Sequence, residues 1–289
     1  MITALSFGEI QWDIYPDARY IGGAPFNFAA HLAKHGEEVY MLSAVGDDAL
    51  GQEALTHLKK QNLHTDYVAI DSAKPSGNCT VSLDEQGVPT FCIARDVAWD
   101  YLTCRGVPSG MFDLLYFGTL ALRTQQNTEE LLALIQRGGF REIFADVNIR
   151  PPFYSADSIR TVMEKATIIK ISDEELPVLL QEIGMTYTEE YASLCRGLVR
   201  QFPQINVLII TRGEKGACAY TAQDDRFYQT DAVKAVVVST TGAGDSFSAA
   251  FIHTYLRGDT VQAALDYAAK VAAFVVSNPD AVPEYQPIP

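Results

Sequence analysis

A glycine-rich turn, GAGD at residues 242–245, lies directly before a run of small and apolar residues. In that run, SFSAAFIHTYLRG, the residues Phe247, Phe251 and Tyr255 recur every four positions, which predicts a helix that ends near Gly258. The first N–H groups of a helix lack intrahelical partners and carry a partial positive charge. Because glycine has no Cβ, a ligand can approach these groups closely.

The turn is suited to phosphoryl transfer. The backbone of Gly242, Ala243 and Gly244 would form an anion hole for a phosphoryl group whose negative charge shifts during transfer. Asp245 would lie beside this hole and accept a proton from an attacking hydroxyl. A plainer interpretation stays open, in which Asp245 is an acid favoured by the helix dipole and the glycines form a tight turn. Neither a GxxxxGK[ST] loop nor a GxGxxG motif with an acid about 20 residues further on fits this segment.

Short apolar strands alternate with helix-like segments along most of the sequence. The expected strands are TALSFGEI, EVYMLSAVG, DLLYFGTL, REIFADVNI, ATIIKIS and NVLIITRG. The segments PFNFAAHLAKHG and ALGQEALTHLKKQN have the apolar spacing of helices. This alternation predicts the α/β class, with a central, mostly parallel sheet and helices on both faces.

Residues 77–95 depart from this alternation. Two alternating segments, NCTVSLD and PTFCIAR, are joined by the turn-like EQGV and predict a hairpin with no helix between its strands. Val81, Leu83, Phe91 and Ile93 would give the hairpin an apolar face. A hairpin inserted in an α/β domain is typical of a flap near the ligand-binding edge of the sheet.

Composition excludes several classes of partner. The 289 residues carry a formal net charge of -14, which disfavours nucleic acid and anionic membranes as partners. No window approaches the roughly 20 apolar residues of a membrane span, and MITALSFGEIQW lacks the pattern of an export signal. The five cysteines are scattered and never spaced as CxxC, which favours reduced thiols in the cytoplasm over a zinc site.

Two long segments resemble the signatures of the ribokinase-like (PfkB) family of carbohydrate kinases. TTGAGDSF at residues 240–247 is similar to one signature, and GGAPFNFAAHLAKHG at 22–36, followed by AVGDDALG at 44–51, is similar to the other. The resemblance continues in family order through GEIQWD, VAWDYL, ADVNIRPPFY, ISDEEL and ITRGEKGA, and so spans nearly all of the chain. VAWDY and DVNIRPP look most like the fructokinase branch. The resemblance implies a ribokinase-like fold, ATP and Mg²⁺ as cofactors, and transfer of the γ-phosphoryl group to a sugar hydroxyl.

The resemblance also implies roles for the matched residues. Asp245 corresponds to the catalytic base, and the backbone of Gly242, Ala243 and Gly244 to the anion hole. The positions matched to the sugar site are Asp13, Gly23, Asn27, Asn148 and Arg150. The positions matched to the ATP site are Thr211, Gly213, Gly216 and Asn278. Glu175 corresponds to the glutamate of the NxxE motif, which helps to organise Mg²⁺ through water.

Some of these residues have plainer interpretations when taken singly. Asp13 suits a turn, Asn27 suits the first turn of a helix, and Arg150 suits a surface position at the end of a strand. Two positions also depart from the family pattern. Ser172 stands where the NxxE asparagine is usual, and Ser239 stands where many relatives have an aspartate tied to monovalent-cation binding. We therefore expect weak or no dependence on potassium.

The hairpin resembles the family's lid over the sugar. We expect one ribokinase-like domain over residues 1–289, with a small β-sheet lid formed from about residues 10–22 and 75–100. Relatives often pair their lids across a dimer, which predicts a homodimer here, although packing against the chain's own core explains the apolar hairpin residues as well.

Three functions remain in view. A fructokinase is the leading hypothesis, and a kinase for 2-keto-3-deoxygluconate or another sugar acid is the alternative within the fold. A sugar acid requires a cationic partner in the pocket, for which Arg95 is a candidate. In a different class, the chain would be a catalytically silent protein that senses a sugar or a nucleotide.

Overall fold

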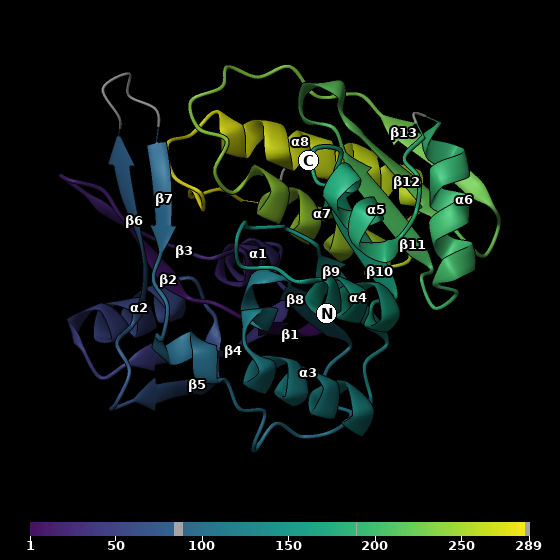
Figure 1. Ribbon diagram of the computed structural model, residues 1–289. Helices are drawn as coiled ribbons and strands as arrows, with labels where there is room; N and C mark the ends of the chain where they lie inside the picture. Colours follow the sequence, from purple (N-terminus) through teal and green to yellow (C-terminus); the bar gives the residue numbers. More distant parts are fainter. Residues whose placement is uncertain (84–88, 189, 287–289) are drawn as a thin grey trace.

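A nine-stranded sheet in the order β13-β12-β11-β10-β9-β8-β1-β4-β5 forms the centre of the computed structural model (Figure 1), which describes residues 1–83, 89–188 and 190–286. Its strands are β1 (Thr3–Phe7), β4 (Glu38–Gly46), β5 (His64–Asp71), β8 (Leu114–Gly118), β9 (Glu142–Asp146), β10 (Ile168–Ser172), β11 (Val207–Thr211), β12 (Ala217–Thr221) and β13 (Arg226–Thr230). Neighbouring strands of this sheet are parallel from β5 through β11. β12 is antiparallel to β11, and β13 is antiparallel to β12. The predicted α/β class with a mostly parallel sheet is confirmed.

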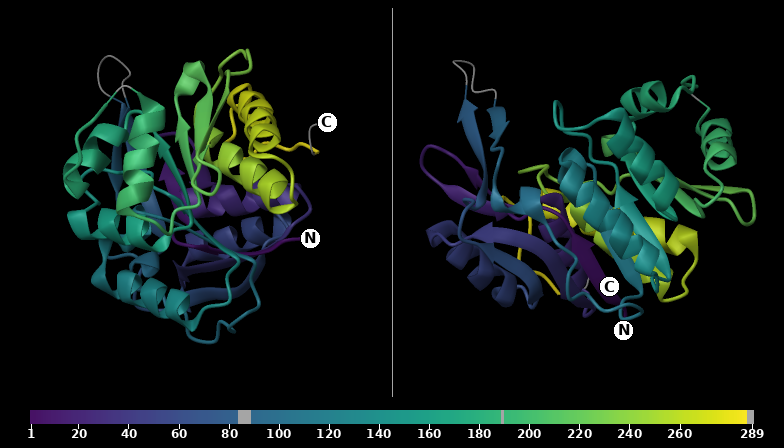
Figure 2. Two further views of the ribbon diagram at one scale, coloured as in Figure 1. Left: turned by 90° about the vertical axis from the view of Figure 1, so that its right-hand side faces the viewer. Right: turned by 60° about the horizontal axis from the view of Figure 1, so that its bottom comes forward.

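Helices cover both faces of this sheet (Figure 2). They are α1 (Ala24–Lys34), α2 (Ala49–Lys60), α3 (Gln125–Arg137), α4 (Ala156–Lys165), α5 (Leu176–Ile183), α6 (Tyr191–Gln201), α7 (Ala243–Leu256) and α8 (Val261–Val276). Leu5 and Phe7 of β1 belong to the core beneath α3–α6, whereas Ala4 belongs to the core beneath α1, α2, α7 and α8. Successive side chains of a strand point to opposite faces, so covering both faces requires strands that are apolar throughout.

Local sequence signals set the helix ends. The Asp48 side chain accepts a hydrogen bond from the N–H of Gly51 (2.8 Å) and so caps α2. Pro25 lies in the first turn of α1, where a missing N–H breaks no helical hydrogen bond. The chain leaves α1 through Gly36, which has a φ of 83°. In the described ranges, no helix has both the length and the apolar character that crossing a bilayer requires.

A second sheet of four strands, in the order β3-β2-β6-β7, forms the lid. Its strands are β2 (Gln11–Ile14), β3 (Arg19–Gly22), β6 (Gly77–Leu83) and β7 (Pro89–Ile93). The predicted hairpin is present, since β6 and β7 pair in antiparallel fashion with Cys79 opposite Ile93; its turn, EQGV, lies outside the described residues. Figure 1 shows β6 and β7 extending beyond the body of the molecule. Because β2 pairs in parallel with β6, two distant segments of the chain form one lid.

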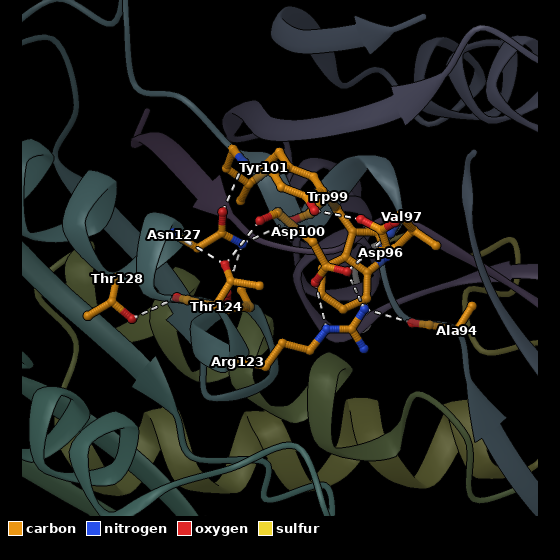
Figure 3. A network of polar contacts seen from close by, with 12 residues as sticks. Ala94, Asp96, Val97, Trp99, Asp100, Tyr101, Arg123, Thr124, Asn127 and Thr128 are labelled. Carbon is orange, nitrogen blue, oxygen red and sulfur yellow. Dashed lines mark hydrogen bonds and ion pairs between the residues drawn. The ribbon is translucent and has the colours of Figure 1, made fainter. Parts of the chain in front are cut away.

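A buried ion pair fixes the base of this lid to the body (Figure 3). Arg123 donates hydrogen bonds from Nε and Nη2 to the carboxylate of Asp100 (2.6 and 2.7 Å), and Nη2 also donates to the carbonyl of Ala94 (2.7 Å). The guanidinium carbon lies 3.8 Å from the centre of the Trp99 ring. Asn127 of α3 donates to the carbonyl of Trp99 (2.9 Å). The chain that leaves β7 is therefore held against α3 immediately after the hairpin.

Candidate active site

The first turn of α7 contains the predicted chemistry. The helix begins at Ala243, so Gly244 and Asp245 lie in its first turn, and Gly242 precedes it with a φ of 81°. A Cβ on Gly242 would lie 2.3 Å from the carbonyl oxygen of Ala281, so the close approach and the backbone angle both require glycine. The N–H of Ala243 donates to the carbonyl of Thr240 (3.3 Å), while Gly244 is exposed.

A cavity of about 530 Å³ opens in front of this turn. The predicted site residues that line it are Asp13, Gly23, Asn27, Asn148, Arg150, Gly242, Gly244 and Asp245. They come from β2, the β3–α1 junction, α1, the segment after β9 and the start of α7. The structure thus brings every residue predicted for the sugar site together with the predicted base, although these residues are separated widely in sequence.

The other predicted residues are not among the described residues that line this cavity. Thr211 ends β11, and Gly213 begins a short 3₁₀ helix after it. Gly216 has a φ of 82°, and a Cβ there would lie 2.0 Å from the carbonyl oxygen of Thr230. Asn278 donates from Nδ2 to the carbonyl of Phe274 (2.8 Å) and so completes the end of α8. Their roles in binding ATP stay predictions, as does that of Ala243.

Asp245 is partly buried and is held by α1. Asn27 Nδ2 donates a 2.7 Å hydrogen bond to Asp245 Oδ2. Burial, and then the charge of Asp146, raise the pKa of Asp245 to about 6, against the hydrogen bond from Asn27 and the charges of Lys170 and Arg150. The carboxylate is therefore ionised at neutral pH and is more basic than an ordinary aspartate, which suits a general base.

Unsatisfied acceptors gather around the same cavity. Glu9, directly after β1, accepts a 3.2 Å hydrogen bond at Oε1 from the N–H of Ala24, but its buried Oε2 has no partner among the described residues. The same holds for Gln11 Oε1 and Asn27 Oδ1. Burial raises the pKa of Glu9 to about 7, and the charge of Asp245 adds to this effect while backbone hydrogen bonds oppose it. Buried acceptors without partners are costly, and sugar hydroxyls are donors that satisfy them.

Asp13 lies on the lid side of the same cavity. Burial raises its pKa to about 6, against the charge of Arg150 and a hydrogen bond from Gln11. Asn148 has a φ of 42°, a left-handed angle that asparagine tolerates better than most residues. This turn after β9 sends the chain toward Arg150, which lines the cavity from the body.

Glu9, Asp146 and Lys170 were missing from the predicted site. Lys170 of β10 donates to both carboxylate oxygens of Asp146 on β9 (2.8 and 2.7 Å), and both residues line the cavity. A signal for Lys170 was present in the sequence, because a lysine inside the apolar run ATIIKIS must be buried in a parallel sheet and requires a partner. Glu9 had a weaker signal, an acid near the end of the expected strand TALSFGEI, at the ligand-binding edge of the sheet.

Glu175 directly precedes α5 and is not among the described residues that line the cavity. Its Oε1 accepts a hydrogen bond from the N–H of Ile149 (2.6 Å) and its Oε2 accepts one from the N–H of Ser172 (2.9 Å). No cluster of three or more histidines, cysteines and carboxylates that could hold a metal occurs within the described ranges. Mg²⁺ keeps most of its waters in kinase sites, and each carboxylate oxygen of Glu175 retains a lone pair for such a water, so this residue fits an ion bound through water.

Comparison with known proteins identifies the family. The model for "pfkB family carbohydrate kinase" matches residues 17–287. A probable fructokinase-5 of Arabidopsis thaliana is 27% identical over 271 residues, which cover 86% of this chain and 81% of that protein. A 5-dehydro-2-deoxygluconokinase of Listeria innocua is 25% identical over 304 residues, which cover 98% of this chain and 89% of that protein. The crystal structure of a fructokinase with bound ATP from Xylella fastidiosa superposes with a TM-score of 0.85 at 19% identity, covering 97% of this chain and 94% of that one.

The chain belongs to the pfkB family of carbohydrate kinases. The fold agrees with this assignment, since the mostly parallel sheet and the small lid sheet match ribokinase-like structures over nearly the whole chain. The resemblance found in the two signature segments is confirmed.

The raised pKa of Glu9 makes stability depend on pH. Ionisation of Glu9 is harder in the folded state, where its pKa is about 7, than at the ordinary value of 4.5, so stability falls as pH rises through this window. The substitution Glu9→Gln keeps the acceptor for Ala24 and removes the ionisation. The free energy of unfolding of Glu9→Gln minus that of wild type should therefore be about 3 kcal/mol larger at pH 8 than at pH 4.5.

Urea unfolding at the two pH values measures this difference. Glu214→Gln, at an exposed position, is the matched control and should show no such change with pH. If the free energy of unfolding of Glu9→Gln differs from that of wild type by the same amount at both pH values, the burial of an ionising group at this position is contradicted.

Proposed function

We propose that this chain is an ATP-dependent sugar kinase that phosphorylates a neutral ketohexose, as a fructokinase does. The observation that carries the proposal is the position of Asp245, which lies in the first turn of α7 and faces a cavity with polar groups for a polyol. Membership of the carbohydrate kinase family gives the reaction class. The cavity residues support the finer assignment.

Each wall of the cavity has a task in this reaction. Asp13 and Asn27 offer acceptors and donors to adjacent sugar hydroxyls, and Arg150 offers further donors. Asp245 accepts the proton of the attacking hydroxyl while the sugar oxygen bonds to the γ-phosphorus. The bond from that phosphorus to the bridging oxygen breaks, and ADP leaves with the electron pair. The backbone at residues 242–244 stabilises the charge on the phosphoryl oxygens.

The nucleotide would bind with its γ-phosphate at the first turn of α7. The fructokinase from Xylella fastidiosa contains ATP in its crystal structure, which supports ATP as the donor here. The residues proposed to bind it are Thr211, Gly213, Gly216 and Asn278. Glu175 would hold Mg²⁺ through water, and the ion supplies positive charge that neutralises the β- and γ-phosphates.

The charges of the cavity favour a neutral sugar. Among its described lining residues, Glu9, Asp13, Asp146 and Asp245 outnumber the cationic Arg150 and Lys170. A substrate carboxylate would add another negative charge to this set.

A sugar-acid kinase is the second candidate, because the Listeria innocua relative is a 5-dehydro-2-deoxygluconokinase and Arg150 could pair with a carboxylate. Arg95 gives this candidate less support. It stacks over Phe153 at 4.9 Å and lines a neighbouring cavity of about 260 Å³.

Turnover by the Asp245→Asn variant tests the assignment. With saturating Mg-ATP, the rate of ADP release in the presence of fructose should fall by about 100-fold or more, because a general base is lost, while calorimetry should show that the sugar still binds. Unchanged turnover would remove Asp245 from the mechanism.

A panel of fructose, other ketoses and keto sugar acids tests which substrate the wild-type chain phosphorylates. If the wild-type chain binds a sugar without any turnover, it is a sensing protein.

The Ser239 position predicts how the enzyme responds to potassium. Ser239 Oγ accepts a 3.2 Å hydrogen bond from the N–H of Thr241, and the side chain brings no negative charge to this turn. Turnover should therefore be the same in K⁺ and in Na⁺ at fixed Mg-ATP. Ser239→Asp restores a carboxylate and should gain stimulation by K⁺. A large increase with K⁺ in the wild-type chain would contradict the prediction.

A homodimer through the lid and a cytoplasmic location complete the proposal. Tyr20 on the edge strand β3 is 52% exposed and offers apolar surface to a second lid. Light scattering at micromolar concentration should give a dimer mass, and Tyr20→Glu should shift it toward the monomer. A monomer mass for the wild-type chain would refute the dimer. The five free cysteines fit a reducing compartment.

A further inference from the structure

The pair formed by Lys170 and Asp146 has an unusual position for a buried ion pair. The two residues are directly opposite each other in the register of the parallel strands β10 and β9. Lys170 is 5% exposed and Asp146 is 2% exposed, and the ammonium group donates to both carboxylate oxygens. Burial lowers the pKa of Lys170, but the charge and hydrogen bonds of Asp146 outweigh it and raise the pKa above its ordinary value. Burial also raises the pKa of Asp146, while the charge and hydrogen bonds of Lys170 lower it, so each member of the pair favours the charged form of the other.

Such a pair gives a sheet little stability. Removing two charges from water costs several kcal/mol per ion, and apolar residues of similar size often replace buried pairs without loss. Two adjacent positions in a sheet whose buried residues are mostly apolar would be filled more simply by Ile or Val. Stabilisation of the sheet therefore does not explain why Lys170 and Asp146 are paired there.

The pair contacts the first turns of α7. A Cβ on Gly244 would lie 3.5 Å from Lys170 Nζ, so the ammonium group lies directly beside the backbone that precedes Asp245. Ser248, three residues beyond Asp245 on the same helix, donates from Oγ to Asp146 Oδ2 (3.4 Å). Both members of the pair also line the cavity that contains Asp245.

We propose that Lys170 and Asp146 act as a positioning unit that fixes the charge beside Asp245 and so keeps its carboxylate ready to accept the proton of the sugar hydroxyl. This inference rests on the proposed kinase function. Lys170 supplies a positive charge that balances Asp146, and neither residue exchanges a proton in the reaction.

The charges that face Asp245 come from residues on or after the strands β1, β9 and β10. Glu9 follows β1, Asp146 belongs to β9, Arg150 follows β9 and Lys170 belongs to β10, while Asn27 of α1 donates the hydrogen bond. The charge of Asp146 raises the pKa of Asp245, and those of Lys170 and Arg150 lower it. Removing one member of the pair therefore changes the proton affinity of Asp245 in a direction that depends on which member is removed.

Opposite shifts in the pH profile are the expected signature. In Lys170→Met the acidic limb of kcat/KM for the sugar should move to higher pH by about one unit, because a positive charge that lowers the pKa of Asp245 is lost. In Asp146→Asn it should move to lower pH by a similar amount, because a negative charge that raises the pKa of Asp245 is lost. The double variant Lys170→Met with Asp146→Asn should have a limb close to that of wild type, and Lys170→Arg, which keeps the charge, should retain it.

A buried pair outside the cavity supplies the matched control. Arg123→Met breaks the Arg123–Asp100 pair of Figure 3, whose side chains are 6% and 4% exposed, and should lower the melting temperature without moving the limb. The proposal is supported if the limb of either single variant shifts in the stated direction and the limb of the double variant does not. If one single variant fails to fold, the other single variant still provides the test. Limbs that agree within about 0.3 unit in every folded variant would overturn it and leave the pair a purely structural role.

A second measurement separates this inference from the proposed function. The chain is labelled with ¹³C-aspartate, the Asp245 carboxyl signal is assigned by its absence in Asp245→Asn, and its titration is followed in wild type and in the variants without sugar or ATP. The titration should shift in the same directions as the limbs. If no sugar is phosphorylated and the shifts persist, the kinase function fails and the charge coupling stands; if turnover is present and the titration does not shift, the coupling is refuted.

Discussion

The hydrogen bond from Asn27 to Asp245 joins the first turns of two helices whose residues are 218 positions apart in sequence. Both helices lie on the same face of the sheet and share one apolar core, so their first turns meet at a fixed place. Asn27 offers one end of its amide to the proposed base, and its Oδ1 has no partner among the residues that the structure describes. The positions of the proposed base, anion hole and sugar-binding wall therefore depend on how α1 packs against α7.

The site concentrates carboxyl groups where the surrounding protein disfavours their ionisation. Burial is the largest cause of the raised pKa values of Glu9, Asp13 and Asp245, and it works against stability at neutral pH. The cations that reach the same cavity, Arg150 and Lys170, oppose this effect through their charge. Burying these carboxyl groups lowers the free energy of unfolding at neutral pH, and it provides carboxylates of raised basicity and acceptors that a polyol can satisfy.

Much of this could be predicted from the sequence, because the signals involved are local. The apolar run EVYMLSAVG coincides with β4 (Glu38–Gly46), and the GAGD turn lies at the start of α7 as the helical spacing indicates. The Lys170–Asp146 pair could not be predicted in this way, since it depends on which strands are neighbours and on their register. The hydrogen bonds that occupy Glu175 depend likewise on how the turn after β10 meets the segment after β9.

The lid is made from two separate stretches of chain, and one of them ends at the sugar pocket. Asp13 lies on the lid strand β2, and Gly23 joins β3 directly to α1, whereas Asp245 belongs to the body. The residue proposed to hold the sugar and the proposed base are thus mounted on different parts of the molecule. In the proposed reaction, any outward displacement of the lid takes Asp13 with it, so the pocket is complete only while the lid is in place, and the phosphoryl donor then meets an alcohol instead of bulk water.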